Sequence, residues 1–528
     1  MSFVSLKFAA FVIGVLLVYY VVPKKMQWFV LLCASYFFYF ATGFGNGFYI
    51  VFTTVSTFLC AILISDEHKH QKEYIQEHKE HLTKEEKKEY KAKVKKRQRA
   101  VLALCLIVNF GILAFLKYND FFISNINLFR LTFYGETDFI DFIMLPLGIS
   151  FYTFQSMGYL VDVYYGKYEA DRHIGKFALF VSFFPQIIQG PISRFGELSK
   201  ELYGEKTFSW YAIKSGFVRI VWGLFKKLII ADRVAAYVKL VADPLNEYKG
   251  LYVLIAVFLY SMQIYADFSG GIDVSIGVAE MLGIKLTENF ERPFFSKSIS
   301  EYWRRWHITL GTWFKDYIFY PLSICKPIIN LGKWTRKNIS DALGKRLPIY
   351  LPMLAVWALT GVWHGSENRY VAWGLLNCFF IILGTEFDPF SKKMIEHFKI
   401  NTTSMWFKAF QICRTFWLMA LLRVFDIAPS IKSAFRMIVN IFRDWSSFRL
   451  EEFYSMDLPK DDLKIALSAC LVVLIVSLLQ RTKSIRERLF ALPGFVQVVL
   501  CTVFTLSVAI YGYYGFGYDA SQFIYIQF

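Results

Sequence analysis

The chain has few charged residues for its length. Asp, Glu, Lys and Arg make up 19% of its 528 residues, whereas 55% are hydrophobic and 19% are aromatic. A soluble protein of this size would carry more charge and would divide into several domains. The apolar residues instead come in blocks of about 20, the length that spans the hydrocarbon core of a bilayer. We therefore expect an all-α polytopic membrane protein.

The sequence also lacks the short motifs of several enzyme classes. It contains no GxSxG, P-loop or HExxH motif, which are the working parts of serine hydrolases, nucleotide triphosphatases and zinc proteases. Its eight cysteines form no CxxC pair and no cluster with histidine, so neither a zinc site nor a disulfide framework is indicated. We expect no metal and no bound cofactor. The absence of an internal repeat disfavours a transporter of the inverted-repeat kind.

The net charge of +17 is spread over many short segments between the apolar blocks. This distribution is typical of positive-inside loops and not of a nucleic-acid-binding surface. Residues 66–99 are charged throughout, with twelve Lys or Arg, eight Asp or Glu and four His. This segment has no apolar face, so it predicts a solvated helix or helical hairpin in the cytoplasm. Three apolar blocks precede it, which places the N-terminus outside unless the short second block only dips into the membrane.

The apolar blocks predict roughly 10 to 12 full spans. They lie at residues 4–22, 27–42, 46–65, 100–117, 142–165, 174–190, 251–268, 348–363, 370–386, 408–425, 464–480 and 492–513. Residues 209–233 and 298–322 mix basic side chains with an aromatic–aliphatic face, as interfacial or re-entrant helices do. In the second stretch we expect one helical face to hold Trp303, Trp306, His307, Leu310 and Phe314. The glycine-rich DFSGGID segment (267–273) is interpreted as a flexible helix end.

Two of the eight histidines lie in tryptophan-rich, otherwise apolar surroundings: His307 in RRWH and His364 in VWHG. An ionisable side chain at membrane depth is costly to bury, so each is a functional candidate. Neutral imidazole can accept a proton from a hydroxyl. A hydrogen bond to a neighbouring helix at an interfacial aromatic belt would explain each histidine equally well. Arg304 and Arg305 could hold an anionic donor, or could be ordinary cytoplasmic anchors.

Five separated stretches resemble the membrane-bound O-acyltransferase superfamily, in its bacterial alginate O-acetylation branch. They are PLGISFYTFQSMGYLVDVYYG (146–166), FFPQIIQGPISRF (183–195), NFERPFFSKSISEYWRRWHITLGTWFKDYIFYPL (289–322), LTGVWHG (359–365) and FIYIQF (523–528). They occur in the order found in the family. Residues 66–99 and the connector around 428–463 match nothing in that pattern.

The resemblance implies a fold and a site. The fold is a single membrane domain over residues 1–528, with 66–99 as an insertion and a ring of transmembrane helices around a thin central region entered by funnels from both faces. The near-invariant histidine of the family corresponds to His364, at the narrow passage, as general base. The second histidine corresponds to His307, which would place the donor or assist proton flow. The candidates for binding substrate beside them are Trp306, Trp363, Arg304 and Arg305.

The resemblance also implies a reaction. We expect an O-acyltransferase in a bacterial plasma membrane that moves an acyl group, most simply acetyl, toward hydroxyls of an extracellular polysaccharide. The donor would be a cytoplasmic thioester such as acetyl-CoA or an acyl carrier protein, and an extracytoplasmic acetyltransferase partner would complete the transfer. The alternatives are D-alanyl transfer to teichoic acid, and a non-enzymatic transporter or scaffold of a polysaccharide export complex. Neither non-enzymatic alternative explains why two Trp-His motifs occur together.

Overall fold

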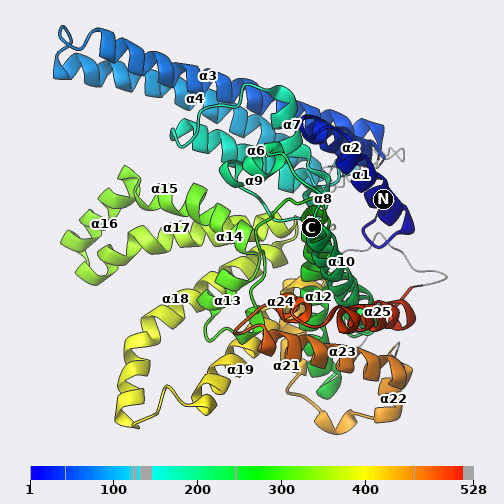
Figure 1. Ribbon diagram of the computed structural model, residues 1–528. Helices are drawn as coiled ribbons and strands as arrows, with labels where there is room; N and C mark the ends of the chain where they lie inside the picture. The colour runs from blue at the N-terminus through cyan, green and yellow to red at the C-terminus, as the bar shows by residue number, and fades with distance from the viewer. Residues whose placement is uncertain are drawn as a thin grey trace. The chain divides into compact units, whose positions relative to one another are not determined.

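The computed structural model describes residues 2–41, 43–119, 145–243, 247–456 and 458–514, and also residues 123, 126, 127, 129, 130 and 132. In this part of the chain all regular structure is helical, and the one extended pairing is an isolated bridge between Phe290 and Trp306. The all-α class expected from the sequence is therefore confirmed (Figure 1). The FIYIQF stretch (523–528) lies outside the described residues.

The helices form two compact units, which are described separately. Unit 1 comprises Met1–Lys214 and Val278–Leu286, and unit 2 comprises Ser215–Gly277 and Thr287–Phe528. The helices of unit 1 are α1 (Leu6–Val21), α2 (Gln27–Phe40), α3 (Gly47–Glu77), α4 (Lys84–Lys117), α6 (Ile149–Tyr164), α7 (Ile174–Ser182), α8 (Phe184–Ile187) and α9 (Phe195–Tyr203), with short 3-10 turns η1 (Lys24–Met26) and η2 (Phe44–Asn46). Within this unit α3 packs against α4 and α6, and α2 packs against α7.

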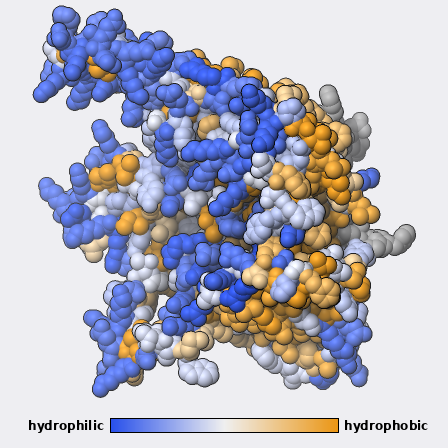
Figure 2. Space-filling model, viewed as in Figure 1, coloured by the Kyte–Doolittle hydropathy of each residue, from blue (hydrophilic) through white to orange (hydrophobic). Residues whose placement is uncertain are grey.

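The charged segment 66–99 lies within a long antiparallel hairpin of α3 and α4 (Figure 1). Thr83 starts α4 with a capping box: its hydroxyl accepts from the Glu86 N–H at 3.2 Å, and the Glu86 carboxylate accepts from the Thr83 N–H at 2.8 Å. Tyr74 of α3 stacks on Tyr90 of α4, with ring centroids 4.3 Å apart. The outer end of the hairpin is strongly hydrophilic (Figure 2). The predicted helical hairpin is confirmed, and its cytoplasmic location stays a prediction.

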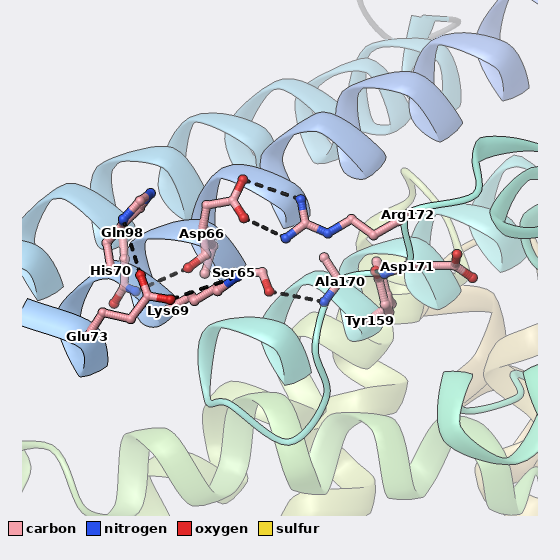
Figure 3. Close-up of polar contacts among 11 residues, drawn as sticks. Ser65, Asp66, Lys69, His70, Glu73, Gln98, Tyr159, Ala170, Asp171 and Arg172 are labelled. Atoms are coloured by element: carbon pink, nitrogen blue, oxygen red, sulfur yellow. Dashed lines mark hydrogen bonds and ion pairs between the residues drawn. The ribbon is translucent and has the colours of Figure 1, made fainter. Parts of the chain in front are cut away.

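The hairpin is anchored at mid-length by the loop that follows α6 (Figure 3). The Asp66 carboxylate of α3 accepts a hydrogen bond from Arg172 at 2.5 Å, and this contact raises the pKa of the Arg172 guanidinium. The neighbouring Ser65 hydroxyl accepts from the Ala170 N–H at 3.2 Å. The charged segment 66–99 therefore begins at the point where α3 makes these contacts with the loop after α6.

Unit 2 contains the remaining helices. They are α10 (Trp210–Leu224), the π-helical η3 (Phe225–Ala231), α11 (Asp232–Ala242), α12 (Leu251–Met281), η4 (Pro293–Phe295), α13 (Ile299–Arg305), α14 (Ile308–Phe314), the π-helical η5 (Lys315–Phe319), α15 (Tyr320–Ser323), α16 (Lys326–Asn338), α17 (Asp341–His364), α18 (Asn368–His397), α19 (Met405–Leu422), α20 (Val424–Ile427), α21 (Ile431–Asn440), η6 (Trp445–Ser447), α22 (Leu450–Ser455), α23 (Lys460–Leu479), α24 (Ile485–Phe490) and α25 (Gly494–Tyr511). The start of α10 and the end of α12 belong to unit 1. In unit 2, α17 packs along both α16 and α18.

Seven of the described helices are long and apolar enough to cross a membrane: α3, α4, α12, α17, α18, α23 and α25. This is fewer than the roughly 10 to 12 spans predicted from blocks of about 20 apolar residues. Several of the predicted blocks form shorter helices: α1 has 16 residues, α2 has 14 and α7 has 9. The block at 174–190 is broken at Phe183 (ψ 108°), since Pro185 cannot continue a helix from α7. The chain is nevertheless a multi-pass membrane protein.

Candidate active site

His307 lies at a break between α13 and α14. The chain leaves the helical conformation at Trp306 (φ −108°, ψ 125°), and His307 itself has φ 47° and ψ 53°. The expectation that residues 303–314 present one continuous helical face is therefore wrong. A side chain other than glycine rarely adopts positive φ, and such strained backbone clusters at functional sites.

Asn289 holds the buried ring of His307. The Asn289 side-chain oxygen lies 3.3 Å from His307 Nδ1, and it also accepts from the Thr309 N–H and hydroxyl, both at 3.0 Å. The Thr309 N–H can only donate, so the Asn289 atom that it contacts is the amide oxygen, which is an acceptor. His307 Nδ1 faces the same oxygen and must therefore donate to it. We assign the ring proton to Nδ1 and the lone pair to Nε2. Burial lowers the pKa of His307 to about 3, so the ring is neutral at physiological pH.

His364 is the last residue of α17 and is also buried. Its ring centroid lies 4.5 Å from that of Trp373 on α18, in an edge-to-face arrangement. The two helices approach closely beside it: a Cβ added to Gly374 would lie 2.3 Å from the Trp357 carbonyl oxygen, and one added to Gly361 would lie 2.5 Å from the Tyr370 carbonyl oxygen. Small residues at a helix crossing permit such backbone proximity. The α17–α18 contact therefore sets the position of His364.

Trp363 connects the two histidines within unit 2. Its ring centroid lies 6.0 Å from that of His307 and 5.0 Å from that of His364. Phe268 of α12 closes the other side of His307 at 4.8 Å. The structure therefore brings together side chains that are 57 positions apart in the sequence. Both rings lie in one aromatic cluster.

The other predicted site residues lie in different surroundings. Trp306 is buried between the Tyr302 ring, stacked at 5.6 Å, and the Arg423 guanidinium, 4.2 Å from its ring centroid. The contacts of the Trp306 ring are thus with side chains of the protein itself. Arg304 is exposed, and Arg305 forms an ion pair with Glu301 at 2.6 Å. The substrate-binding roles of these residues, and of Trp363, stay predictions.

A buried charge network in unit 2 was missed from the sequence. Lys226 of η3 lies 2.6 Å from the Asp273 carboxylate and donates to the Ser269 hydroxyl at 2.7 Å. Arg219 of α10 binds the same carboxylate at 3.0 Å and Glu288 at 2.5 Å. These cations face inward, and the interfacial or re-entrant location of residues 209–233 stays a prediction. Beside this network, Lys227 lies 2.6 Å from the Asp267 carboxylate. The signal that could have found these pairs was the presence of two carboxylates, Asp267 and Asp273, within an otherwise apolar run.

The DFSGGID segment lies in the middle of α12, not at a helix end. A Cβ added to Gly270 would lie 2.8 Å from the Gly223 carbonyl oxygen, and one added to Gly277 would lie 2.7 Å from that of Gly216. The glycines therefore allow α10 and α12 to pack backbone against backbone. This close approach, and not flexibility, explains their place in the segment.

A cavity of about 740 Å³ lies within unit 2. Residues of α10, α12, α23, α24 and α25 form most of its wall, together with the Arg219–Lys226–Asp273 network. The wall reaches Ile308, the residue next to His307. Among the described residues, no group of three His, Cys, Asp or Glu side chains could hold a metal ion.

Part of this chain is similar to a known protein family. Residues 170–327 match the family model described as MBOAT, membrane-bound O-acyltransferase family. This region is therefore similar to the membrane-bound O-acyltransferase family. It includes His307 and the charge network of α10 and α12, and His364 follows it in the sequence.

Several curated proteins are similar to the chain outside this region as well. It is 34% identical over 302 residues to a protein of Pseudomonas syringae pv. tomato named probable alginate O-acetylase, which covers 56% of this chain and 54% of that protein. It is 30% identical over 367 residues to a peptidoglycan O-acetyltransferase of Helicobacter pylori, covering 65% and 64%. A teichoic acid D-alanyltransferase of Bacillus subtilis is 29% identical over 249 residues, covering 47% and 60%. The chain spans about half the length of the alginate O-acetylases that it matches.

Proposed function

We propose that the chain is a membrane O-acyltransferase that moves an acyl group, most simply acetyl, from a cytoplasmic thioester toward hydroxyls of an extracellular polysaccharide. The observation that carries this proposal is the meeting of His307 and His364 at Trp363 in a buried aromatic cluster. The similarity of residues 170–327 to the O-acyltransferase family supports the same chemistry. A scaffold would not need two buried imidazoles at one tryptophan, whereas a transporter would use them as a proton relay without acyl chemistry.

In this proposal His364 is the general base. Its imidazole takes the proton of the acceptor hydroxyl while the hydroxyl oxygen forms a bond to the thioester carbonyl carbon. The C–S bond then breaks, and the imidazolium returns the proton to the departing thiolate, so that the base is regenerated. Contact with Trp373 and the close α17–α18 packing keep the ring in one orientation, which this step requires.

His307 has a supporting role in this reaction. Its neutral ring, held at Nδ1 by Asn289, presents Nε2 as a hydrogen-bond acceptor. It can therefore orient the donor thioester or pass a proton toward His364. Arg304 and Arg305 are the candidates for attracting an anionic donor from the cytoplasm.

We infer the acyl group and the acceptor from the similar proteins. The alginate O-acetylase and the peptidoglycan O-acetyltransferase match longer stretches than the D-alanyltransferase, which favours acetyl over D-alanyl transfer. The donor is then acetyl-CoA or an acyl carrier protein. The hydroxyl that His364 activates belongs either to the polysaccharide itself or to a carrier from which an extracytoplasmic acetyltransferase completes the transfer. The protein would act in a bacterial plasma membrane with its N-terminus outside.

The test is the ester-linked acetate on cell-surface polysaccharide in cells that express His364→Ala. We expect loss of acetate at unchanged membrane abundance of the protein, and a smaller loss for His307→Ala. His397→Ala is the matched control, because His397 is an exposed histidine at the end of α18. Its acetylation should equal that of the unmodified protein.

Other outcomes would overturn parts of the proposal. Loss of ester-linked D-alanine in His364→Ala, with acetate unchanged, would replace acetyl by D-alanyl transfer. Retention of both esters would remove His364 from the reaction. Labelled-acyl transfer in reconstituted vesicles separates an enzyme from a transporter or scaffold, since only the enzyme modifies an acceptor.

A further inference from the structure

The cavity of unit 2 has an uneven distribution of charge. Five basic side chains and three carboxylates line it. In its inner part the charges are matched, because Asp273 pairs with Lys226 and Arg219. Arg219 also pairs with Glu288, whose side chain is 59% exposed. The remaining basic residues of the wall are Arg292, Arg481 and Arg486, against Glu291 alone. The cavity therefore combines an electrically balanced interior with a positively charged rim.

The rim arginines come from two segments and lie close together. Arg292 precedes α13 and donates to the Ser477 carbonyl oxygen of α23 at 3.3 Å. Burial, together with the nearby charges of Arg305 and Arg481, lowers the pKa of Arg292. The backbone of Arg292 also has φ 47°, a costly conformation for a residue other than glycine. The like-charge proximity would be offset by an anion bound among the guanidinium groups.

Another part of the cavity wall is apolar. It is formed by Trp222 of α10, by Val472 and Val476 of α23, and by Leu500 and Phe504 of α25. Only 6% of the apolar window of α25 and 22% of that of α23 are buried. The outer faces of these helices are thus suited to contact lipid, and the cavity lies behind them. An occupant should therefore be anionic at one end and apolar along its length.

The connection between α23 and α25 indicates the side of the membrane. Residues 480–493 contain Arg481, Lys483, Arg486 and Arg488 and one acidic residue, Glu487. Such an excess of Lys and Arg beside spans is typical of cytoplasmic loops. The cytoplasmic leaflet carries anionic lipids, and basic pockets between transmembrane helices on that side bind their headgroups.

We propose that this cavity is a binding site for an anionic phospholipid. The phosphate lies among Arg292, Arg481 and Arg486, and an acyl chain lies against the wall formed by Trp222 and Phe504. The volume of about 740 Å³ falls within the range of about 300–1,000 Å³ found for ligand pockets. The arginines and apolar side chains that would hold the lipid are not residues assigned to the proposed acyl transfer, and the wall also reaches Ile308 beside His307.

The test titrates the delipidated full-length protein in mild detergent with phosphatidylglycerol, phosphatidylcholine, inorganic phosphate or CoA, and follows binding by thermal shift. We expect a shift with phosphatidylglycerol only. Arg481→Ala and Arg486→Ala should each weaken its apparent affinity about fivefold, the change that corresponds to about 1 kcal/mol per basic residue near anionic lipid. Lys483→Ala is the matched control in the same connection, outside the described wall, and should bind as the unmodified protein does.

Three results would overturn the proposal. An equal shift with phosphatidylcholine would remove the role of the arginines. A shift with phosphate or CoA that competes with the lipid would assign the site to a soluble phosphate ester.

If the variants fail to fold, a photoreactive phosphatidylglycerol is cross-linked to the unmodified protein. Adducts concentrated on α10, α23 and α25 support the site, and adducts spread evenly over other helices contradict it.

Discussion

His307 and His364 reach the same aromatic cluster by different backbone means. His307 is presented by a left-handed residue between two short helices, and its ring is fixed by Asn289. His364 is presented by the end of a long helix, and its ring is fixed by packing against Trp373. The orientation of His307 thus depends on one hydrogen bond, whereas that of His364 depends on the contact of two helices.

Asn289→Asp is expected to change the pH dependence of acyl transfer. A carboxylate beside Nδ1 favours imidazolium, so the pKa of His307 should rise from about 3. Because the proposed role needs the neutral ring, activity should begin to fall at a higher pH as the medium is acidified. The measurement is the pH profile of labelled-acyl transfer in vesicles. Asn289→Ala should lower the rate without this shift, and an unchanged profile for Asn289→Asp would contradict the positioning role.

At the scale of helices, close crossings recur at glycine in unit 2. Gly361 and Gly374 bring α17 and α18 together, and Gly223 and Gly270 do the same for α10 and α12. Interiors of membrane proteins depend on such packing, since lipid supplies no hydrophobic force between helices. Each crossing also orders polar or ionisable side chains, His364 in the first case and Lys226 in the second.

Gly374→Ala should disturb the histidine site through helix separation. The added methyl group would lie 2.3 Å from the Trp357 carbonyl oxygen, so α17 and α18 must move apart. Overpacking of this kind costs about 1–3 kcal/mol. We expect a lower Tm and reduced acyl transfer. Gly384→Ala on the same helix is the control, because its Cβ would meet nothing within 4 Å; equal effects of both substitutions would refute the explanation.

Asp273→Asn should destabilise unit 2 strongly. It leaves the buried Lys226 without the carboxylate that lies 2.6 Å away, and breaking a buried ion pair costs about 3–5 kcal/mol. A drop in Tm of the purified protein, measured by thermal shift, checks this. Asp461→Asn removes a carboxylate from the exposed pair with Lys464 and should leave Tm unchanged. A Tm of Asp273→Asn equal to that of the unmodified protein would mean that the network does not stabilise the fold.

At the scale of the whole molecule, two basic segments predict the orientation in the membrane. One is the α3–α4 hairpin, and the other is the connection between α23 and α25. The positive-inside rule places both in the cytoplasm. The ring of helices with a thin centre, implied by the family resemblance, stays a prediction.

The orientation can be tested with single cysteines. His81→Cys in the hairpin and Lys483→Cys in the second segment are introduced into a variant that lacks the eight native cysteines. A membrane-impermeant maleimide should label neither position in intact cells and both after lysis. Labelling of either position in intact cells would place that segment outside. It would also reverse the proposed side for the donor or for the lipid.

The sequence by itself determined the class of the molecule. Long apolar blocks predict membrane helices because backbone polar groups in lipid must be satisfied within the segment. The dense charge of residues 66–99 likewise predicts a solvated hairpin, since it leaves no continuous apolar face. The Trp-His motifs identified His307 and His364 as candidates because these ionisable side chains stand in apolar context. All of these properties depend on local composition, which is readable without coordinates.

Only the tertiary structure decided how these parts meet. Periodicity placed His307 on a continuous helix, but the Asn289 contacts and the left-handed backbone break that helix. Composition predicted an interfacial or re-entrant helix around Lys226 but gave no partner for its charge, which Asp273, distant in sequence, supplies in the folded chain. The cluster at Trp363 and the arginine rim of the cavity also join residues far apart in the chain. Contacts between distant residues compensate the free-energy cost of burying a charge or straining the backbone. Local sequence patterns do not contain these contacts, so such sites can be recognised only in the folded chain.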